Sequence, residues 1–221
     1  MRYIYCHPLF DERKCAHRFS YDLHKTFEKA SLTLERFDYC GTGEAEGRFE
    51  DVSLNSLRAD VEAQINGDEI CLIGLRFGAT ILLNYTAANP RVVKKLVLLE
   101  PVIDGAGYVD YLYRKQHIKD LMTGESTDKL MENGFVNIEG YKTSVLFLDQ
   151  IKNMNPFTIS PECPVLIVQI SNNIKIEPEI KTLKERTGHS EIKVINMPTF
   201  WERISISDYS ELTDTILRWC K

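Results

Sequence analysis

The residues of this chain best suited to chemistry lie in a short turn, Gly74-Leu-Arg-Phe-Gly78, with an arginine at its centre. Two glycines four positions apart allow a strand to turn tightly into a helix and present the middle side chain, because a Cβ atom would clash at those close approaches. The guanidinium of Arg76 stays protonated and cannot attack a carbonyl. It can bind a carboxylate or phosphate through two parallel hydrogen bonds. The turn therefore predicts a site for an anionic group.

Three more polar residues lie near the ends of predicted strands, at the edge of the sheet where Arg76 is expected. Glu12 and Glu100 can each form an ion pair with Arg76, or serve as a general base if burial brings the pKa near the working pH. His7 leaves the first predicted strand and can face the same pocket, where it would move a proton. The alternative for His7 is a loop histidine that is bonded to the backbone.

Aromatic residues complete the predicted ligand-binding set, which is Arg76, Phe77, Glu100, Phe200 and Trp201. Phe77 directly follows the arginine. Phe200 and Trp201 follow the last predicted strand, where they either wall the pocket or pack in the core. An indole ring over the guanidinium of Arg76 would be a favourable cation–π contact.

A serine-type catalytic triad does not fit this pattern. Such a triad needs a nucleophile in the turn, an acid after a later strand and a histidine after the last strand. The turn carries Arg76, Ser171 and Asn172 follow the strand predicted at 165–170, and Trp201 lies where the histidine is expected. The candidate catalytic residues are therefore Arg76, Glu12 and His7.

The elements that must position these residues alternate along the chain. Strands are predicted at 3–6, 32–37, 70–73, 95–99, 165–170 and 192–195, with helices such as 16–30 between them and a last helix around Ile216. This alternation is typical of crossover units. We therefore expect the α/β class, with a mostly parallel twisted sheet and helices on both of its faces.

The alternation breaks at residues 105–161, which contain helical patches and aromatic residues but no clear strand. We interpret this segment as a cap inserted between two parts of one core, 1–104 and 162–221. An insert that starts after Glu100 would lie over the crevice at the carboxyl ends of the strands, where open α/β sheets bind ligands. Its tyrosines at 108, 111 and 113 pack inside the cap or bind a protein partner.

Composition excludes several classes of function. With 221 residues, a net charge of −5 and no long basic run, the chain does not fit a nucleic-acid-binding protein. Its six cysteines form no Cys-x-x-Cys pair, so neither a zinc site nor a disulfide framework is expected. The glycines between Asp38 and Gly47 have the wrong spacing for a dinucleotide site, so we expect no cofactor. No signal sequence or membrane-length apolar run is evident, which favours a cytoplasmic location.

Four blocks of sequence carry a family resemblance: His7–Arg18, Asp38–Gly47, Gly74–Ala79 and Pro198–Trp201. The chain resembles the α/β-hydrolase superfamily and, within it, the second type of exosortase A system-associated hydrolase, a bacterial family linked to PEP-CTERM sorting. That family also has Gly-Leu-Arg-x-Gly-Ala at this turn, so the resemblance implies that its arginine is a family feature. This chain departs from the family pattern at Leu9, where the family has proline. The word hydrolase in the family name rests on fold.

Two classes of function remain open. In the first, a hydrolase-fold protein without catalytic triad binds a small anionic or acyl-bearing molecule at Arg76, as an accessory factor in a biosynthetic pathway. In the second, an enzyme uses Arg76 with Glu12 or His7 on an ester, thioester or amide. A third interpretation is a protein that binds another chain through its cap.

Overall fold

The computed structural model describes residues 1–65, 69–124, 132–156, 160–205 and 207–221. By its internal contacts the chain divides into two compact units. Unit 1 is Met1–Phe37, Gln64–Ile103 and Pro156–Lys221, and unit 2 is Asp38–Ala63 and Asp104–Asn155. Parts of the expected cap, 125–131 and 157–159, lie outside the described residues.

Unit 1 is built on a six-stranded sheet in the order β2-β1-β3-β4-β7-β8. Its strands are β1 (Arg2–Cys6), β2 (Leu34–Arg36), β3 (Ile70–Leu75), β4 (Val93–Leu99), β7 (Val165–Ile170) and β8 (Ser190–Ile195). All neighbouring pairs are parallel. Every residue of β3 and β7 is buried, as continuous apolar strands in the middle of a parallel sheet must be. The predicted α/β class is confirmed.

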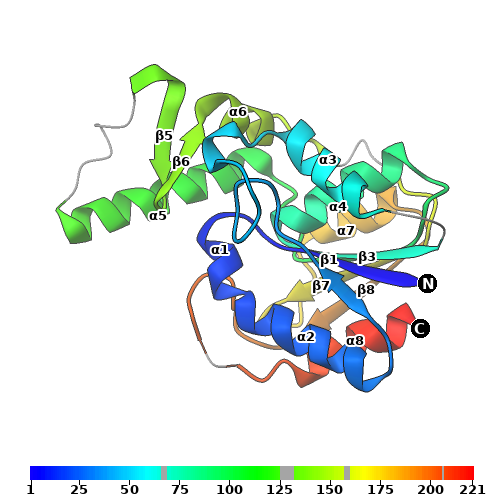
Figure 1. Ribbon diagram of the computed structural model, residues 1–221. Coiled ribbons are helices and arrows are strands. Elements are labelled where there is room, and N and C mark those ends of the chain that lie inside the picture. The colour runs from blue at the N-terminus through cyan, green and yellow to red at the C-terminus, as the bar shows by residue number, and fades with distance from the viewer. Residues whose placement is uncertain (66–68, 125–131, 157–159, 206) are drawn as a thin grey trace. The chain divides into compact units, whose positions relative to one another are not determined.

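Helices cover both faces of this sheet (Figure 1). After the short helix α1 (Phe10–Cys15), α2 (His17–Lys29) lies with α8 (Ser210–Cys220) on one face, and α4 (Phe77–Ala88) and α7 (Pro178–Arg186) lie on the other. The apolar stripe Phe19, Leu23 and Phe27 of α2 is fully buried. Because these residues repeat every four positions, they lie on the single helix face that packs on the strands.

Two cysteines far apart in sequence meet in the core of unit 1. The Sγ atoms of Cys71, in β3, and Cys220, at the end of α8, are 3.5 Å apart, and both side chains are fully buried. The end of α8 is held by Lys95 of β4, whose Nζ donates to the carbonyls of Trp219 and Cys220 at 3.0 and 3.1 Å. A cation near the last carbonyls of a helix satisfies groups that have no partner within the helix.

Unit 2 contains the short helix η1 (Phe49–Asp51), α3 (Leu54–Gln64), α5 (Gly105–Thr123), η3 (Glu132–Gly134), β5 (Phe135–Ile138), β6 (Tyr141–Ser144) and α6 (Val145–Lys152). The expectation of no strand between 105 and 161 is wrong, because β5 and β6 form an antiparallel hairpin. Its two turn residues, Glu139 and Gly140, have φ values of 54° and 95°, and positive φ at both positions matches the twist of paired strands. Lys115 of α5 forms an ion pair with the buried Glu139.

The tyrosines of α5 are only partly available to a partner. Tyr108 is buried and stacks on Tyr111, with 6.3 Å between the ring centroids. The large apolar side chains of this helix that are exposed are Ile118, Leu121 and Met122.

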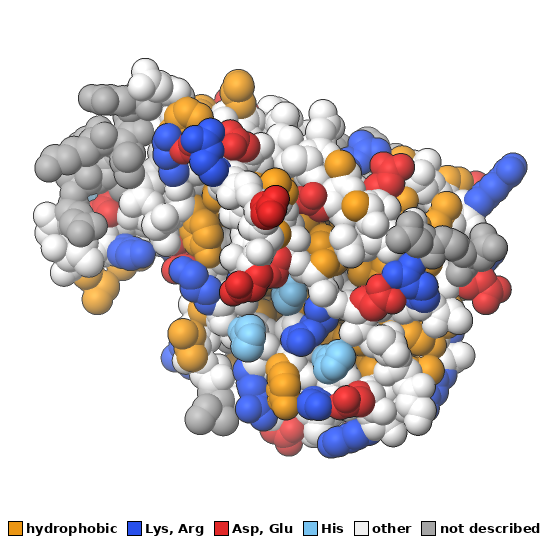
Figure 2. All heavy atoms as spheres, viewed as in Figure 1, with side chains coloured by type: hydrophobic (Ala, Val, Ile, Leu, Met, Phe, Trp, Pro, Cys, Tyr) orange, Lys and Arg blue, Asp and Glu red, His pale blue; other side chains and the backbone are white. Residues whose placement is uncertain are grey.

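Two further observations bear on the classes of partner. In the described ranges, no helix has the length and apolar character needed to cross a bilayer. On the face drawn in Figure 2, acidic and basic side chains are interspersed and do not gather into one stripe.

Candidate active site at the β3–α4 turn

Arg76 is the single residue between β3 and α4, and its backbone adopts an unusual conformation. Its φ and ψ are 54° and −124°, a region that non-glycine residues rarely enter. The Arg76 N–H donates to the carbonyl of Leu99 at 2.9 Å, which ties the turn to the end of β4. Strained backbone of this kind persists only where surrounding contacts hold it, and it is typical of ligand and active sites.

The two glycines of the turn are required by close packing. A Cβ atom on Gly74 would lie 2.6 Å from the Cα of Ala79, and a Cβ on Gly78 would lie 2.3 Å from the carbonyl oxygen of His7. Both distances are well inside van der Waals contact. The turn is therefore as tight as the glycine spacing predicts, and it presses the start of α4 against the end of β1.

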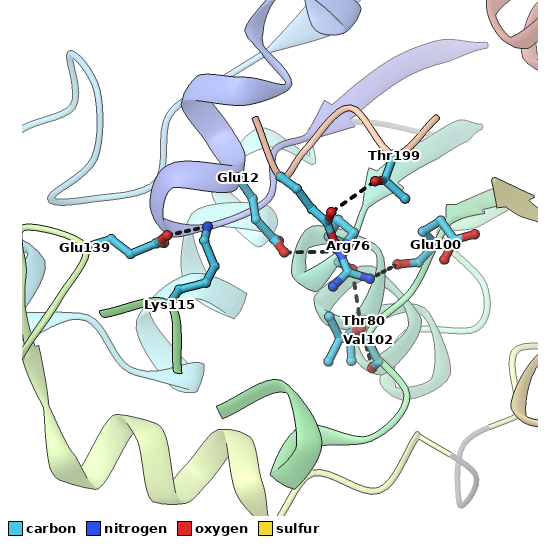
Figure 3. A network of polar contacts seen from close by, with 9 residues as sticks. Glu12, Arg76, Thr80, Glu100, Val102, Lys115, Glu139 and Thr199 are labelled. Carbon is cyan, nitrogen blue, oxygen red and sulfur yellow. Dashed lines mark hydrogen bonds and ion pairs between the residues drawn. The ribbon is translucent and has the colours of Figure 1, made fainter. Parts of the chain in front are cut away.

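Arg76 forms an ion pair with Glu12, which lies in α1 (Figure 3). The Nε of Arg76 is 3.2 Å from Oε1 of Glu12. The Glu12 side chain is 0% exposed, whereas 17% of the Arg76 side chain remains accessible. Because a buried carboxylate needs a charged or hydrogen-bonding partner, the pair fixes the guanidinium at the base of the site.

Glu100 also contacts Arg76, but through its main chain. It follows β4 directly with a φ of 43°, and its carbonyl accepts a hydrogen bond from Nη1 of Arg76 at 3.3 Å. Its carboxylate accepts the backbone N–H of Ile170 in β7. Burial raises the pKa of Glu100 to about 7, against the opposing effects of the Ile170 N–H and the charge of Arg76. This carboxyl group therefore titrates near neutral pH.

Trp201 covers the guanidinium of Arg76. The Cζ of Arg76 lies 5.1 Å from the centre of the indole ring, within the range of a cation–π contact. Phe200 stands behind Trp201, and its ring is also 4.9 Å from that of Phe19 and 5.1 Å from that of Tyr209. Of the two residues expected to wall the pocket, Trp201 reaches Arg76 and Phe200 packs in the core.

His7 and Phe77 reach the turn in other ways. His7 follows β1, is buried, and packs its ring edge-on against Tyr5 with the centroids 4.9 Å apart. Its carbonyl oxygen faces Gly78, so the loop after β1 touches the start of α4. The Phe77 side chain is fully buried. Only the backbone of Phe77 is therefore placed to meet a ligand at the turn.

The structure adds one residue that sequence reasoning missed. The Oγ1 of Thr80, one helical turn after Arg76, donates to the carbonyl of Val102 at 2.8 Å (Figure 3). This bond ties α4 to the segment that leaves β4 after Glu100. A threonine inside a helix gives no sequence signal for such a role. No cluster of His, Cys, Asp or Glu that could hold a metal ion occurs among the described residues.

Comparison with known families identifies the chain. Residues 52–186, more than half of the sequence, match the Ndr family. The chain belongs to the Ndr family. The matched segment of this Ndr-family member includes Arg76 and Glu100, whereas Glu12 and Trp201 lie outside it. No curated protein matches the sequence.

Solved structures similar to this Ndr-family chain are α/β hydrolases. Mouse alpha/beta hydrolase domain-containing protein 10 aligns with a TM-score of 0.65 and 16% identity, over 98% of this chain and 88% of its own. Est1E from Butyrivibrio proteoclasticus, solved with ferulic acid, aligns with a TM-score of 0.69 and 16% identity, over 98% of this chain and 86% of the Est1E chain. A monoacylglycerol lipase from Paleococcus ferrophilus aligns with a TM-score of 0.65 and 15% identity, over 98% of this chain and 92% of the lipase chain. These similarities establish the α/β-hydrolase fold.

Proposed function

We propose that this Ndr-family chain binds a small anionic or acyl-bearing molecule at Arg76 and lacks a Ser-His-Asp triad. In this proposal Arg76 takes the place of the nucleophilic serine of catalytic α/β hydrolases. The observation that carries the proposal is the position of its guanidinium, which lies on a strained strand–helix turn and remains partly accessible. Function belongs to the site and is not inherited from the fold.

The surroundings of Arg76 suit an anion. The amide of Phe77 opens α4, a helix of 12 residues, and the positive end of a helix dipole favours negative charge. Trp201 and Glu12 hold the guanidinium in place, so little side-chain freedom remains to be lost on binding. Glu12 also balances the charge of the arginine when no ligand is bound.

The resemblance to exosortase-associated hydrolases suggests a setting for this activity. We propose an accessory role in a bacterial biosynthetic pathway, in the cytoplasm, with residues 105–161 as a cap. The acyl chain of the ligand would lie against the apolar residues of the site, and its carboxylate or phosphate would meet Arg76.

The test is the thermal shift caused by octanoate and by inorganic phosphate, with octanol as the uncharged control. The informative variant is Arg76→Gln combined with Glu12→Gln, which removes both charges and leaves no buried carboxylate alone. We expect octanoate or phosphate to stabilise the wild type and not the double variant. Equal shifts in both proteins, or no shift with either anion, would exclude Arg76 as the binding group.

A second candidate is an enzyme in which Arg76 stabilises an oxyanion while Glu12 or His7 moves a proton on an ester, thioester or amide. Burial raises the pKa of Glu100 to about 7, so this carboxyl group is a further candidate for the general base at neutral pH. Glu12, fully buried and paired, is better suited to hold Arg76 in position.

Turnover of short- and long-chain p-nitrophenyl esters and acyl thioesters tests this candidate. The proteins to compare are the wild type, Arg76→Lys, Glu100→Gln and His7→Ala from one purification scheme. Loss of turnover in Arg76→Lys together with a changed pH profile in Glu100→Gln would favour the enzyme. Equal rates in all four proteins would exclude it.

A further inference from the structure

The strand β8 forms one edge of the six-stranded sheet and is six residues long. The opposite edge, β2, has only three residues. Among the described residues, no strand pairs with the outer side of β8. A full-length edge strand offers a row of backbone donors and acceptors to another strand.

The ladder with β7 shows which backbone groups of β8 point outward. The N–H of Val165 donates to the carbonyl of His189 at 2.9 Å, and the N–H of Ser171 donates to that of Ile195 at 3.1 Å. Because backbone direction alternates along a strand, the odd-numbered residues of β8 face β7. Ser190, Ile192 and Val194 therefore present their N–H and C=O groups to the outside.

We propose that β8 pairs antiparallel with the β8 strand of a second copy of this chain, with Ile192 opposite its own counterpart. This register places outward-facing residues opposite each other, since Ser190 then meets Val194 of the other copy. Such residues exchange both backbone hydrogen bonds, whereas inward-facing residues form the non-hydrogen-bonded pairs, whose side chains are closest.

The side chains of the same register are complementary in charge. The closest pairs are Glu191 with Lys193 of the other copy, and the two-fold axis repeats each pair. Both side chains are about half exposed and now pair within the strand, at 2.8 Å. A lone lysine on an edge strand opposes strand addition. Here each lysine meets a glutamate, which stabilises a cross-strand pair.

The surface beside β8 also fits a second copy. A hollow of about 440 Å³ lies between β8 and α8 and is lined on the helix by Glu211, Thr215, Arg218 and Trp219. The same two-fold axis would set the two α8 helices antiparallel. Each would then direct its Glu211 end toward the Arg218 end of the other, so the helices have complementary charges as well.

Charge exchange at residues 191 and 193 tests the proposal, with the mass in solution measured by sedimentation velocity from low to high micromolar concentration. We expect a wild-type dimer, about tenfold or more weakened by Lys193→Glu or by Glu191→Lys, because each change sets like charges opposite each other. The control Lys181→Glu makes the same charge change on an exposed residue of α7 and should leave the dimer intact. Circular dichroism confirms that each variant is folded.

Mixing the two single variants gives the decisive result. In a mixed dimer, two glutamates of one chain face two lysines of the other, so we expect heterodimers to form where neither variant pairs with itself. Recovery only in the mixture identifies contact between chains. A wild type that stays monomeric, a dimer that Lys193→Glu does not weaken, or a mixture that stays monomeric would each overturn the proposal.

Discussion

Glu12, in α1 after β1, and Glu100, directly after β4, both lie against Arg76, and they meet it in different ways. Glu12 directs its carboxylate at the guanidinium and is fully buried. Glu100 offers its carbonyl to Arg76 and directs its carboxylate at the N–H of Ile170. Both glutamates are close to Arg76, so distance alone does not determine their roles. The direction of the carboxylate does: Glu12 forms a structural ion pair, whereas Glu100 titrates near neutral pH.

The largest loss of stability should come from breaking the ion pair between Glu12 and Arg76. Glu12→Gln leaves Arg76 without its buried counter-ion, and removing one partner of a buried pair is strongly destabilising. Because Arg76 is partly exposed, we expect a loss of about 3 kcal/mol in the free energy of unfolding, measured in urea. A loss below about 1 kcal/mol, typical of exposed pairs, would show that the pair does not support the fold.

Glu100, in contrast, should make the stability of the fold depend on pH. The folded-state pKa of Glu100 is raised from 4.5 to about 7, so its stabilising contribution is complete below pH 4.5 and is lost as the pH rises to about 7. Glu100→Gln keeps an acceptor for Ile170 and removes the titration. Relative to wild type it should gain about 3 kcal/mol between pH 4 and pH 8. Parallel curves of unfolding free energy against pH for both proteins would contradict the raised pKa.

A smaller effect is expected from the ring that covers Arg76. Trp201→Phe shortens the aromatic surface and weakens the cation–π contact, at a cost of about 1 to 2 kcal/mol in unfolding free energy. Combined with Glu12→Gln, the loss should be less than the sum of the two single losses, because both changes act on the same guanidinium. If the two losses were strictly additive, Trp201 would stabilise the protein through core packing and not through its contact with Arg76.

The smallest effect is expected for an exposed ion pair of α1, which serves as the control for Glu12. Asp11, the neighbour of Glu12 in α1, pairs with Lys14 at 2.7 Å, and the lysine side chain is 58% exposed. Asp11→Asn should change the free energy of unfolding by no more than about 0.5 kcal/mol, because solvent screens such pairs. A change as large as that of Glu12→Gln would mean that charge in α1 matters irrespective of burial.

Much of the core fold could be predicted from sequence. All six strands of the sheet were predicted: β7 has the predicted bounds 165–170, and the other five differ at one or both ends, as in β2, which covers 34–36 of the predicted 32–37. The β5–β6 hairpin was missed because its strands have four residues each and its turn is Glu139-Gly140. The usual signal for this kind of turn has Asn or Asp before the glycine.

The contacts around Arg76 could be predicted in part, because the sequence located the groups but not their orientation. The glycine spacing located Arg76, and the order of the strands brought two acids to it. Glu100, whose backbone φ is 43°, directs its carboxylate toward Ile170 in β7, and Glu12 forms the ion pair with Arg76. Nothing in the residue type signals that conformation. The contact between Cys71 and Cys220 was missed for a similar reason, since 149 residues separate the two.

The contact between Cys71 and Cys220 makes thiol labelling a measure of local opening at α8. While α8 stays packed on β3, the Sγ atoms of Cys71 and Cys220 are buried 3.5 Å apart and shielded from reagents. When the helix lifts, both thiols become reactive together, whereas the exposed Cys40 reacts at all times. The rate at which Cys71 and Cys220 themselves are labelled therefore measures how often the last helix opens, with no probe added to the chain.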